Sequence, residues 1–480
     1  MAENAEDTYP SPLPTPNDAS AEEEITERAD TVRTGLSGAP PAIKKVSKRK
    51  LSGPGGRVAI IDGCRTPFAK GSTVLQEMDV VDLAGTCAGE LVTRSGISGD
   101  DLDLSIFGCV IPALNAPNLG REVVFRISLP DHIPASTVNL ACASSNRAIT
   151  SAAEAILVGQ AEVALVGGAE SLSNVPIRLS KNAAHGLMDL NKAKSPGQKL
   201  SALSKLRPKD LIPEAPAIAE YTTGMTMGES AEKMAKENDI SRRAQDEIAL
   251  LSHERAAAAT REGRFAQQIV PTFPPPKHDE AVLTDNGVRA DTSMDALSSL
   301  DPVFDRRYGT ITAGNSSPIT DGASALLLMS EEKAEELGYE ALGFIRSWSY
   351  AALDPSTQLL QGPAFAAPRA LDLAGLKLQD MDLIEMHEAF AAQILSNMKA
   401  FASKTFAEEE LGRSEPLGEI DLERFNVNGG SIAIGHPFGA TGGRVTMQLL
   451  FELARRDLNL GLITVCAAGG VGFSMVVERE

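Results

Sequence analysis

Residues 136–168, STVNLACASSNRAITSAAEAILVGQAEVALVGG, place three structural patterns in immediate succession. Residues 136–140 have the character of a strand and lead directly to Cys142. Small and apolar residues then recur at helical spacing over residues 148–157. The apolar run 163–166, followed by two glycines, predicts a buried strand. Strand–helix–strand alternation of this kind is typical of an α/β layered fold.

The same alternation of strand and helix patterns continues on both sides of this stretch. Strands are expected near residues 57–62, 106–111, 323–329, 343–347, 462–466 and 472–477, and helices near 80–93, 241–262, 366–374 and 389–401. A short apolar run occupies residues 382–386. Residues 179–305 differ, because they carry lysine and arginine clusters, several prolines and an alanine-rich helical stretch. They indicate an inserted loop domain, whose basic first half is either a place for anion contacts or an ordinary solvated surface.

These patterns predict four parts in the 480-residue chain. Residues 1–55 form a disordered acidic tail rich in Pro, Ser, Ala, Glu and Thr. Residues 56–178 and 306–335 form a first α/β half, residues 179–305 the loop domain, and residues 336–480 a second α/β half.

The composition and net charge of the chain disfavour several kinds of partner and several classes of protein. The net charge of −19 makes nucleic acid and anionic lipid unlikely partners, because like charges repel. No apolar run approaches the roughly 20 residues that span a bilayer, and no signal peptide is recognisable. The five cysteines form no close pairs, which disfavours a disulfide framework or a zinc site. We therefore expect a protein of the reducing cytoplasm.

Cys142 lies between the strand pattern and the helix pattern. Unpaired N–H groups at a helix start stabilise a thiolate, the nucleophilic form of cysteine. Small neighbours, among them Ala141, Ala143 and Ser144, leave room for a substrate carbonyl. Taken alone, the local sequence favours the other interpretation, a buried and inert cysteine at a helix start.

His436 lies in a glycine-rich stretch, NVNGGSIAIGHPFGATGG at residues 426–443, that leads into a helix pattern. Glycines allow backbone to approach a ligand closely, and a histidine in such a loop can act as a general base. The stretch lacks the Gly-Lys-Ser/Thr ending of a Walker loop. A histidine that only serves the turn remains the alternative.

Cys466 and His387 are two further candidates for a chemical role. Cys466 ends an apolar strand and precedes Ala467-Ala468-Gly-Gly, a turn that exposes N–H groups at a strand end. This cysteine is either an acid/base thiol or a core residue. His387-Glu388 begins like a zinc-binding helix but has alanine at position 391, so it predicts no metal site. His387 is either a junction residue or an oxyanion donor.

Several motifs together resemble the thiolase family over residues 57–480. They are VNLACASSN at 138–146, GGAES at 167–171, TAGNSS at 312–317 with TDGA at 320–323, HEAFAAQ at 387–393, the Asn-Gly-Gly and Gly-His-Pro stretch, and CAAGG at 466–470. The resemblance implies an α/β, thiolase-like fold. It has two similar βαβαβαββ halves in a five-layered α-β-α-β-α core, with an inserted loop domain.

The resemblance also implies roles. Cys142 matches the acylated nucleophile, His436 its base, and Cys466 the acid/base that protonates the departing acetyl-CoA enolate. His387 stands where many thiolases carry asparagine, and there it would help His436 to hold a water facing the thioester oxygen. The N–H groups of Cys142 and Ala468 match a second oxyanion hole. Ala468 replaces a frequent glycine, which leaves the backbone angles of this turn open, and Ser317 matches a serine that contacts pantetheine.

His387 and the segment at residues 221–229 narrow the resemblance further. Both resemble the thiolase (β) subunit of fatty-acid oxidation trifunctional complexes. This implies thiolytic cleavage of 3-ketoacyl-CoA with coenzyme A as co-substrate, no tightly bound cofactor and no metal. It also implies a partner subunit with hydratase and dehydrogenase activities, while the resemblance to the thiolase family as a whole implies a homodimer.

Three alternatives remain open. A biosynthetic acetoacetyl-CoA thiolase runs the same chemistry in reverse, and His387 in place of asparagine speaks against it. A decarboxylating ketosynthase is disfavoured, because a second catalytic histidine is expected where Cys466 stands. A non-catalytic acyl-CoA- or lipid-binding protein is disfavoured because Cys142, His436 and Cys466 are all retained.

Overall fold

The computed structural model describes residues 51–177, 179–212 and 219–479. Almost all of the predicted tail at residues 1–55 therefore lies outside the described residues. Among the described residues, no helix combines the length and the apolar character needed to cross a membrane. All five cysteines are described, and all are free thiols.

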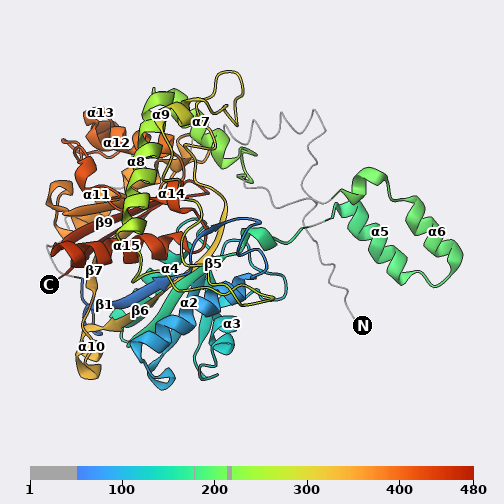
Figure 1. Ribbon diagram of the computed structural model, residues 1–480, viewed down its shortest axis with the longest axis horizontal. Helices are drawn as coiled ribbons and strands as arrows, with labels where there is room; N and C mark the ends of the chain where they lie inside the picture. The colour runs from blue at the N-terminus through green and yellow to red at the C-terminus, as the bar shows by residue number, and fades with distance from the viewer. Residues whose placement is uncertain (1–50, 178, 213–218, 480) are drawn as a thin grey trace, which may run out of the picture. The chain divides into compact units, whose positions relative to one another are not determined.

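The main sheet is mixed and has the strand order β4-β3-β5-β6-β1-β7-β10-β9-β8, with the short β2 paired to β6 (Figure 1). Its strands are β1 (Val58–Arg65), β2 (Ala69–Lys70), β3 (Leu104–Gly108), β4 (Ala135–Val138), β5 (Val163–Glu170), β6 (Thr320–Ser330), β7 (Gly343–Ala352), β8 (Leu383–Met386), β9 (Leu460–Ala467) and β10 (Val471–Glu478). Each strand predicted from the sequence is present.

The helices connect these strands and cover the sheet. In the two halves they are α2 (Val80–Ser95), α3 (Leu119–Arg126), α4 (Ser144–Leu157), α10 (Glu331–Leu337), α11 (Gly362–Ala374), α12 (Ala391–Ala402), α13 (Lys404–Glu409), α14 (Ser431–Ile434) and α15 (Thr441–Arg456). Short 3₁₀ turns are η1 (Gly99–Asp101), η2 (Leu172–Asn174), η3 (Pro208–Leu211), η4 (Leu359–Gln361), η5 (Leu378–Asp380) and η6 (Leu422–Arg424).

The described part of residues 179–305 contributes helices but no strand of the main sheet. These helices are α5 (Lys181–Lys192), α6 (Pro196–Ser204), α7 (Met227–Glu237), α8 (Arg242–Arg261) and α9 (Met294–Ser298). The lysines that gave the first half of this region its basic character are exposed. The boundaries of the four predicted parts stay a prediction.

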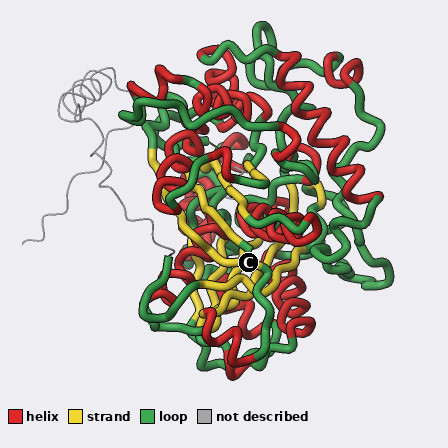
Figure 2. Tube along the Cα trace, turned by 90° about the vertical axis from the view of Figure 1, so that its left-hand side faces the viewer, coloured by secondary structure: helices red, strands yellow, loops and turns green. Residues whose placement is uncertain are grey.

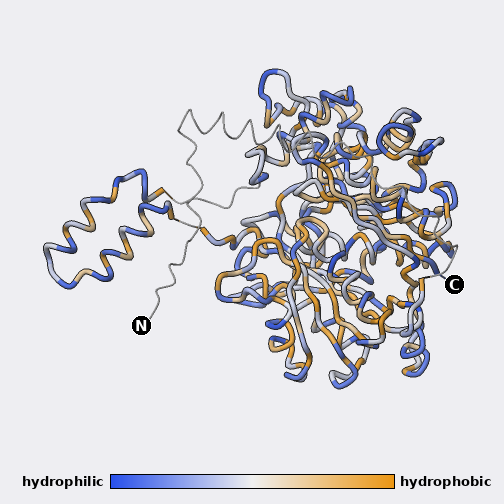
Figure 3. The backbone as a smooth tube through the Cα atoms, turned by 180° about the vertical axis from the view of Figure 1, so that it is seen from behind, coloured by the Kyte–Doolittle hydropathy of each residue, from blue (hydrophilic) through white to orange (hydrophobic). Residues whose placement is uncertain are grey.

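Local sequence explains why individual elements form. Helix α2 begins where the Asp79 side chain accepts the N–H groups of Val81 and Asp82, and it ends at Gly96 in the left-handed conformation. Strand β5 is buried at every position, which fits the run of apolar and small residues that precedes its last residue, Glu170. Figure 3 shows hydrophobic residues concentrated along the interior strands, with hydrophilic residues on the outer turns.

The two halves of the sheet repeat one pattern. In the first half β1 pairs antiparallel with β6, β6 antiparallel with β5, and β5 parallel with β3. In the second half β7, β10, β9 and β8 pair in the same order and the same directions. This repetition agrees with two similar halves.

The second half departs from the predicted βαβαβαββ order, because its third strand is missing. The first half has β4, which pairs parallel with β3. At the equivalent place the second half has only an isolated parallel bridge between Ile384 and Phe425. The chain there makes one backbone contact with β8 and turns at once into the loop that carries His436, so no ladder extends.

The layers follow from the packing of the helices. Helices α4 and α15 pack against each other and against strands of both halves, so they form the middle layer. Helices α2 and α3 cover the outer face of the first half-sheet, and α11 and α12 cover the outer face of the second. Figure 2 shows strands running between helical segments. The arrangement is the predicted α-β-α-β-α core, and both α4 and α15 begin at its centre.

Candidate active site

Cys142 occupies a sharp turn between β4 and α4. Ala141 adopts a positive φ of 46°, a conformation that costs energy for a residue with a side chain. The Ser144 hydroxyl stabilises the turn, since it donates to the Ala141 carbonyl at 2.7 Å and accepts the Leu140 N–H at 2.9 Å. Helix α4 then begins at Ser144. The turn therefore presents Cys142, a half-buried residue, at the start of the helix.

His436 reaches this thiol from the second half of the chain. Its Nε2 lies 3.2 Å from the Cys142 Sγ, although the two residues are 294 positions apart in sequence. Gly435 makes the approach possible, because its φ is 115° and a Cβ there would lie 2.6 Å from the Thr320 Cγ2. The pairing of cysteine and histidine expected for a nucleophile and its base is thus present in the geometry.

The hydrogen bond at Nδ1 of His436 determines which of the two ring nitrogens carries the proton. Its Nδ1 lies 2.6 Å from the Thr441 hydroxyl, and that hydroxyl donates to the Pro437 carbonyl at 3.0 Å. Since the hydroxyl proton is used on Pro437, Thr441 accepts the Nδ1–H of His436. The Nε2 nitrogen is then bare and can accept the thiol proton of Cys142.

Burial keeps the Cys142 thiol and the His436 ring uncharged in the resting protein. It raises the pKa of the Cys142 thiol to about 12, although the N–H groups of Ala468 and of Cys142 itself lower it. Burial, with a smaller contribution from the nearby Arg444 charge, lowers the pKa of His436 to about 3. The amides at the turn favour the thiolate as expected from the sequence, but burial outweighs them. Proton transfer must therefore accompany attack on the substrate.

His387 completes a cluster of three side chains. Its ring centroid lies 4.1 Å from that of His436, and one ligating atom each of Cys142, His387 and His436 lie within 4.8 Å of one another. Burial and the positive surroundings hold the pKa of His387 well below its usual value, so the ring is neutral. Helix α12 begins only at Ala391, so His387 and Glu388 lie in the turn before it rather than on a helix.

This cluster has the donor types that zinc prefers, two imidazoles and a thiol. The sequence predicts no metal here, and the acid/base chemistry of the three groups requires none. Glu388 does not join them, because its carboxylate accepts hydrogen bonds from Ser252, Asn426 and the Ile432 N–H.

Cys466 lies at the end of β9, fully buried. Burial, together with the proximity of Cys142, holds the pKa of its thiol well above the usual value. The turn that follows brings the Ala468 N–H to the Cys142 thiol. Positive φ values in this turn fall on Gly469 and Gly470 and not on Ala468, so alanine is accommodated without left-handed strain.

Ser317 lies beside the His387 turn through backbone pairing. The Ser317 N–H donates to the Ala389 carbonyl at 3.0 Å, and the Ala391 N–H donates to the Asn315 carbonyl at 2.9 Å. The structure therefore places the predicted residues Cys142, His436, His387, Cys466, Ala468 and Ser317 around one site.

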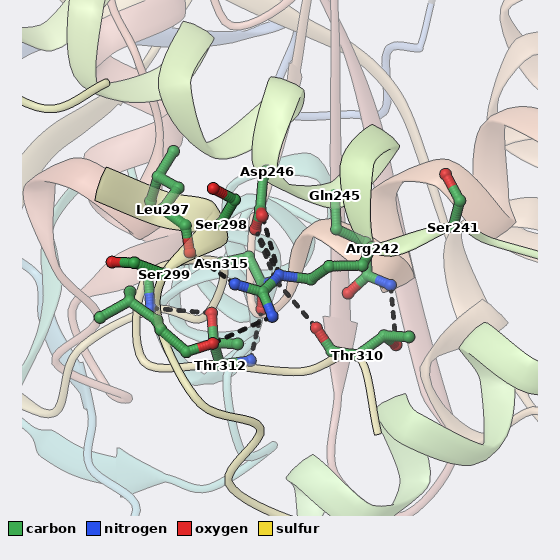
Figure 4. A network of polar contacts seen from close by, with 12 residues as sticks. Ser241, Arg242, Gln245, Asp246, Leu297, Ser298, Ser299, Thr310, Thr312 and Asn315 are labelled. Atoms are coloured by element: carbon green, nitrogen blue, oxygen red, sulfur yellow. Dashed lines mark hydrogen bonds and ion pairs between the residues drawn. The ribbon is translucent and has the colours of Figure 1, made fainter. Parts of the chain in front are cut away.

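A buried polar network holds the Ser317 segment in place (Figure 4). Asn315 donates to the Asp246 carboxylate of α8 at 3.0 Å and to the Thr310 carbonyl at 3.1 Å. Asp246 also binds Arg242, whose guanidinium donates to the Leu297 and Leu300 carbonyls. Helix α8 and the turn around α9 thus fix the loop that lies against His387.

The sequence analysis missed four residues that support the site. Thr441 contacts His436, and Ser431 contacts both His387 and Arg444. Glu170 joins two loops by accepting the N–H groups of Val110 and Ile111 from one and of Gly439 from the other. Two of these bonds also explain why β3 ends at Gly108 rather than at the predicted residue 111. Ser431 and Thr441 lie inside the glycine-rich stretch, and Glu170 inside GGAES, so the motifs contained them without assigning a task.

Comparison with known proteins gives the chain its family context. The family model described as thiolase, N-terminal domain, matches residues 58–332, and the model of the thiolase C-terminal domain matches residues 339–479. A 3-ketoacyl-CoA thiolase of Yersinia pestis (strain Pestoides F) is 49% identical over 426 residues, which cover 89% of this chain and 98% of that protein.

Solved structures agree with this result. An acetyl-CoA acetyltransferase of Bacillus anthracis superposes with a TM-score of 0.76 at 33% identity, covering 88% of this chain and 98% of that one. Human mitochondrial 3-ketoacyl-CoA thiolase in complex with CoA superposes with a TM-score of 0.74 at 30% identity, covering 89% of this chain and 99% of that one.

Proposed function

This chain belongs to the thiolase family, and from that premise we propose that it is a 3-ketoacyl-CoA thiolase, an acyltransferase that uses coenzyme A as its second substrate. The activity is the thiolytic step of fatty-acid β-oxidation. The observation that carries the proposal is the 3.2 Å contact between the Cys142 Sγ and the bare Nε2 of His436.

In the first half-reaction Cys142 becomes acylated. His436 Nε2 takes the thiol proton while Sγ attacks the C3 carbonyl of the substrate. The C2–C3 bond then breaks, and its electron pair moves to C2 as the enolate of acetyl-CoA. The Cys466 thiol donates a proton to C2, which releases acetyl-CoA and leaves a thiolate at Cys466. Positioned proton transfers of this kind contribute roughly 10²–10⁴-fold each.

In the second half-reaction the acyl group moves to coenzyme A. The Cys466 thiolate takes the proton of the CoA thiol, and the CoA sulfur attacks the thioester carbonyl on Cys142. Cys142 leaves as a thiolate and recovers its proton from His436. The product is an acyl-CoA two carbons shorter, and all three side chains return to their starting forms.

Two sets of N–H donors face the oxygens that become negative. The amides of Cys142 and Ala468 lie against the Cys142 thiol and are suited to the carbonyl oxygen of the acyl-enzyme. The His387 ring lies across the site beside His436 and is suited to the thioester oxygen of the departing enolate. Ser317 is proposed to contact the pantetheine arm.

The organisation of the chain follows the same proposal. Residues 56–178 with 306–335 and residues 336–480 are the two thiolase halves, and residues 179–305 are the loop domain that shapes the acyl tunnel. Membership of the thiolase family supports a homodimer, and His387 with the segment at residues 221–229 supports a hydratase/dehydrogenase partner subunit. The five free thiols support a reducing, cytoplasmic setting.

Thiolysis of 3-ketoacyl-CoA esters with short, medium and long acyl chains tests the proposal. We expect acetyl-CoA and the shortened acyl-CoA in equal amounts, dependent on free CoA and measured by mass spectrometry, with medium or long chains preferred. Activity confined to acetoacetyl-CoA would support the biosynthetic alternative. Binding of acyl-CoA without turnover would support a non-catalytic protein.

The pH profile of the same reaction tests the neutral resting pair. The base works when deprotonated, so its activity is present above its pKa of about 3 and lost as pH falls through that value. We expect kcat/KM for the ketoacyl substrate to vary less than about twofold between pH 5.5 and 8. A histidine with an unshifted pKa of about 6.5 would instead lose about tenfold over this range, and such a loss would contradict the assignment.

A further inference from the structure

His387 has two ring nitrogens in very different surroundings. Its Nδ1 lies 2.9 Å from the Ser431 hydroxyl, which belongs to the first residue of α14. Its Nε2 is buried and has no hydrogen-bond partner among the described residues. Since Ser431 occupies Nδ1, Nε2 is the nitrogen left free to face Cys142 and His436.

The hydrogen atoms around Ser431 fix the tautomer of His387. Two groups lie within hydrogen-bond distance of the Ser431 hydroxyl oxygen among the described residues, the His387 Nδ1 and, at 2.7 Å, the Arg444 Nη2. A guanidinium can only donate, so Ser431 accepts from Arg444. The hydroxyl proton of Ser431 then has one acceptor, the His387 Nδ1. A neutral imidazole that accepts at Nδ1 carries its proton on Nε2.

Burial and a nearby carboxylate hold Arg444 in position beside Ser431. It is fully buried in α15, and its Nη1 lies 3.8 Å from the Glu385 carboxylate of β8. Burial is the main reason that the pKa of His387 lies well below its usual value, and the Arg444 charge adds a smaller contribution in the same direction. Arg444 therefore supplies a fixed donor to Ser431, and its charge adds to the effect of burial on the His387 ring.

We propose that Ser431, oriented by Arg444, is a positioning residue that holds His387 as the tautomer with Nε2–H directed at the reacting oxygen. Thr441 does the opposite for His436, because it accepts at Nδ1 and leaves Nε2 bare. Two neutral histidines side by side thus take different tasks, one as a proton acceptor and one as a hydrogen-bond donor. The difference is set by which way two hydroxyl groups point.

The consequence for the reaction rests on the proposed thiolase activity. Charge develops on the thioester oxygen as the C2–C3 bond breaks, and a preoriented N–H stabilises that charge. A bare His387 Nε2 would instead present a lone pair to the enolate oxygen and repel it. Ser431 therefore affects the transition state more than substrate binding, and its loss is a loss of kcat.

A double-mutant cycle with Ser431→Ala and His387→Ala tests this role. We expect Ser431→Ala to lower kcat about tenfold with little change in KM, less than the roughly 10²–10³-fold cost of losing an oxyanion donor, because part of the population keeps Nε2–H. If Ser431 acts only through His387, the same change made in a His387→Ala protein lowers kcat by less than about twofold. Ser431→Thr keeps the hydroxyl and is expected to restore most of the activity.

Equal losses from Ser431→Ala in both backgrounds would overturn the proposal, because they would indicate a purely structural contribution. Solid-state NMR of the resting protein labelled with ¹⁵N-histidine gives a second measurement that needs no activity. The chain has six histidines, so the spectra are tractable. We expect a protonated Nε2 on His387 and a protonated Nδ1 on His436, each assigned by the signal lost in the His387→Ala or His436→Gln protein.

A bare Nε2 on His387 in the wild-type protein would also overturn the proposal. Failure of the proposed function has a different signature. In that case wild-type protein would not cleave any 3-ketoacyl-CoA ester, while the tautomers measured by NMR would still be those expected.

Discussion

Replacing Cys142 with alanine abolishes thiolysis, with an expected fall in kcat of roughly 10⁴–10⁶-fold, the scale seen when a catalytic nucleophile is removed. The physical reason is that the covalent half of the reaction has no alternative. Cys466, the other thiol near the site, is fully buried at the end of β9, and burial holds the pKa of its thiol well above the usual value. It cannot replace Cys142 as the nucleophile.

The measurement follows both turnover and the intermediate. Wild-type protein given a 3-ketoacyl-CoA without free CoA is expected to release one acetyl-CoA per chain and to carry an acyl group on the peptide that contains Cys142. The Cys142→Ala protein is expected to do neither. Cys87→Ala is a matched control, because Cys87 lies in α2 against Cys64 and outside the site.

The control is expected to keep wild-type kcat even if its melting temperature falls. An acyl group on any cysteine other than Cys142 would contradict the scheme. So would thiolysis by the Cys142→Ala protein within about a hundredfold of the wild-type rate, since a lost nucleophile costs much more.

Replacing His436 with glutamine produces the second large effect and changes the pH dependence. The base is lost, so kcat for acylation is expected to fall about 10²–10⁴-fold. The residual rate then depends on spontaneous ionisation of Cys142. Because burial raises the pKa of this thiol to about 12, the thiolate fraction rises about tenfold for each pH unit.

The acylation step is measured alone, as the release of acetyl-CoA in a single turnover without free CoA. We expect the rate of the His436→Gln protein to rise about tenfold per unit from pH 7 to 9, while the wild-type rate stays nearly flat. This design avoids the ionisation of the CoA thiol. His253→Asn is a suitable control, because His253 is also buried but accepts the Arg289 N–H away from Cys142.

A pH-independent residual rate would show that Cys142 does not depend on His436 for its ionisation. A loss smaller than about tenfold would lead to the same conclusion, because general-base catalysis accounts for more than that. Either result would also remove the basis for the assignment of Thr441 as the residue that leaves Nε2 bare.

Much of the fold was predictable from periodicity. The buried strand at residues 163–166 and the helix at 241–262 are present as β5 and α8, because uninterrupted apolar runs and helical spacing specify burial locally. The missing third strand of the second half was not predictable. Phe425 makes a single bridge to β8, and whether a bridge extends into a ladder depends on where the rest of the loop must go.

The residues of the candidate site were likewise only partly predictable from the sequence. Cys142, His436, His387 and Cys466 were identified because they lie in motifs that resemble those of the thiolase family, while the local sequence of each left a purely structural role open. Ser431, Arg444 and Thr441 were not, although two of them lie within the same glycine-rich stretch. A serine or threonine in a loop has many ordinary uses, and only its distances to other groups reveal which hydrogen it donates and which it accepts.

The sequence by itself determined the layered α/β class, the family and the residue types available for the chemistry, because these are set by local pattern and by short motifs. Only the tertiary structure decided how the groups behave. It brought His436 to within 3.2 Å of a cysteine 294 positions away, and it shifted the pKa values so that the resting pair is neutral. It also gave His387 and His436 opposite tautomers, because protonation depends on burial and on hydrogen-bond partners from distant segments, and neither is written in the order of residues.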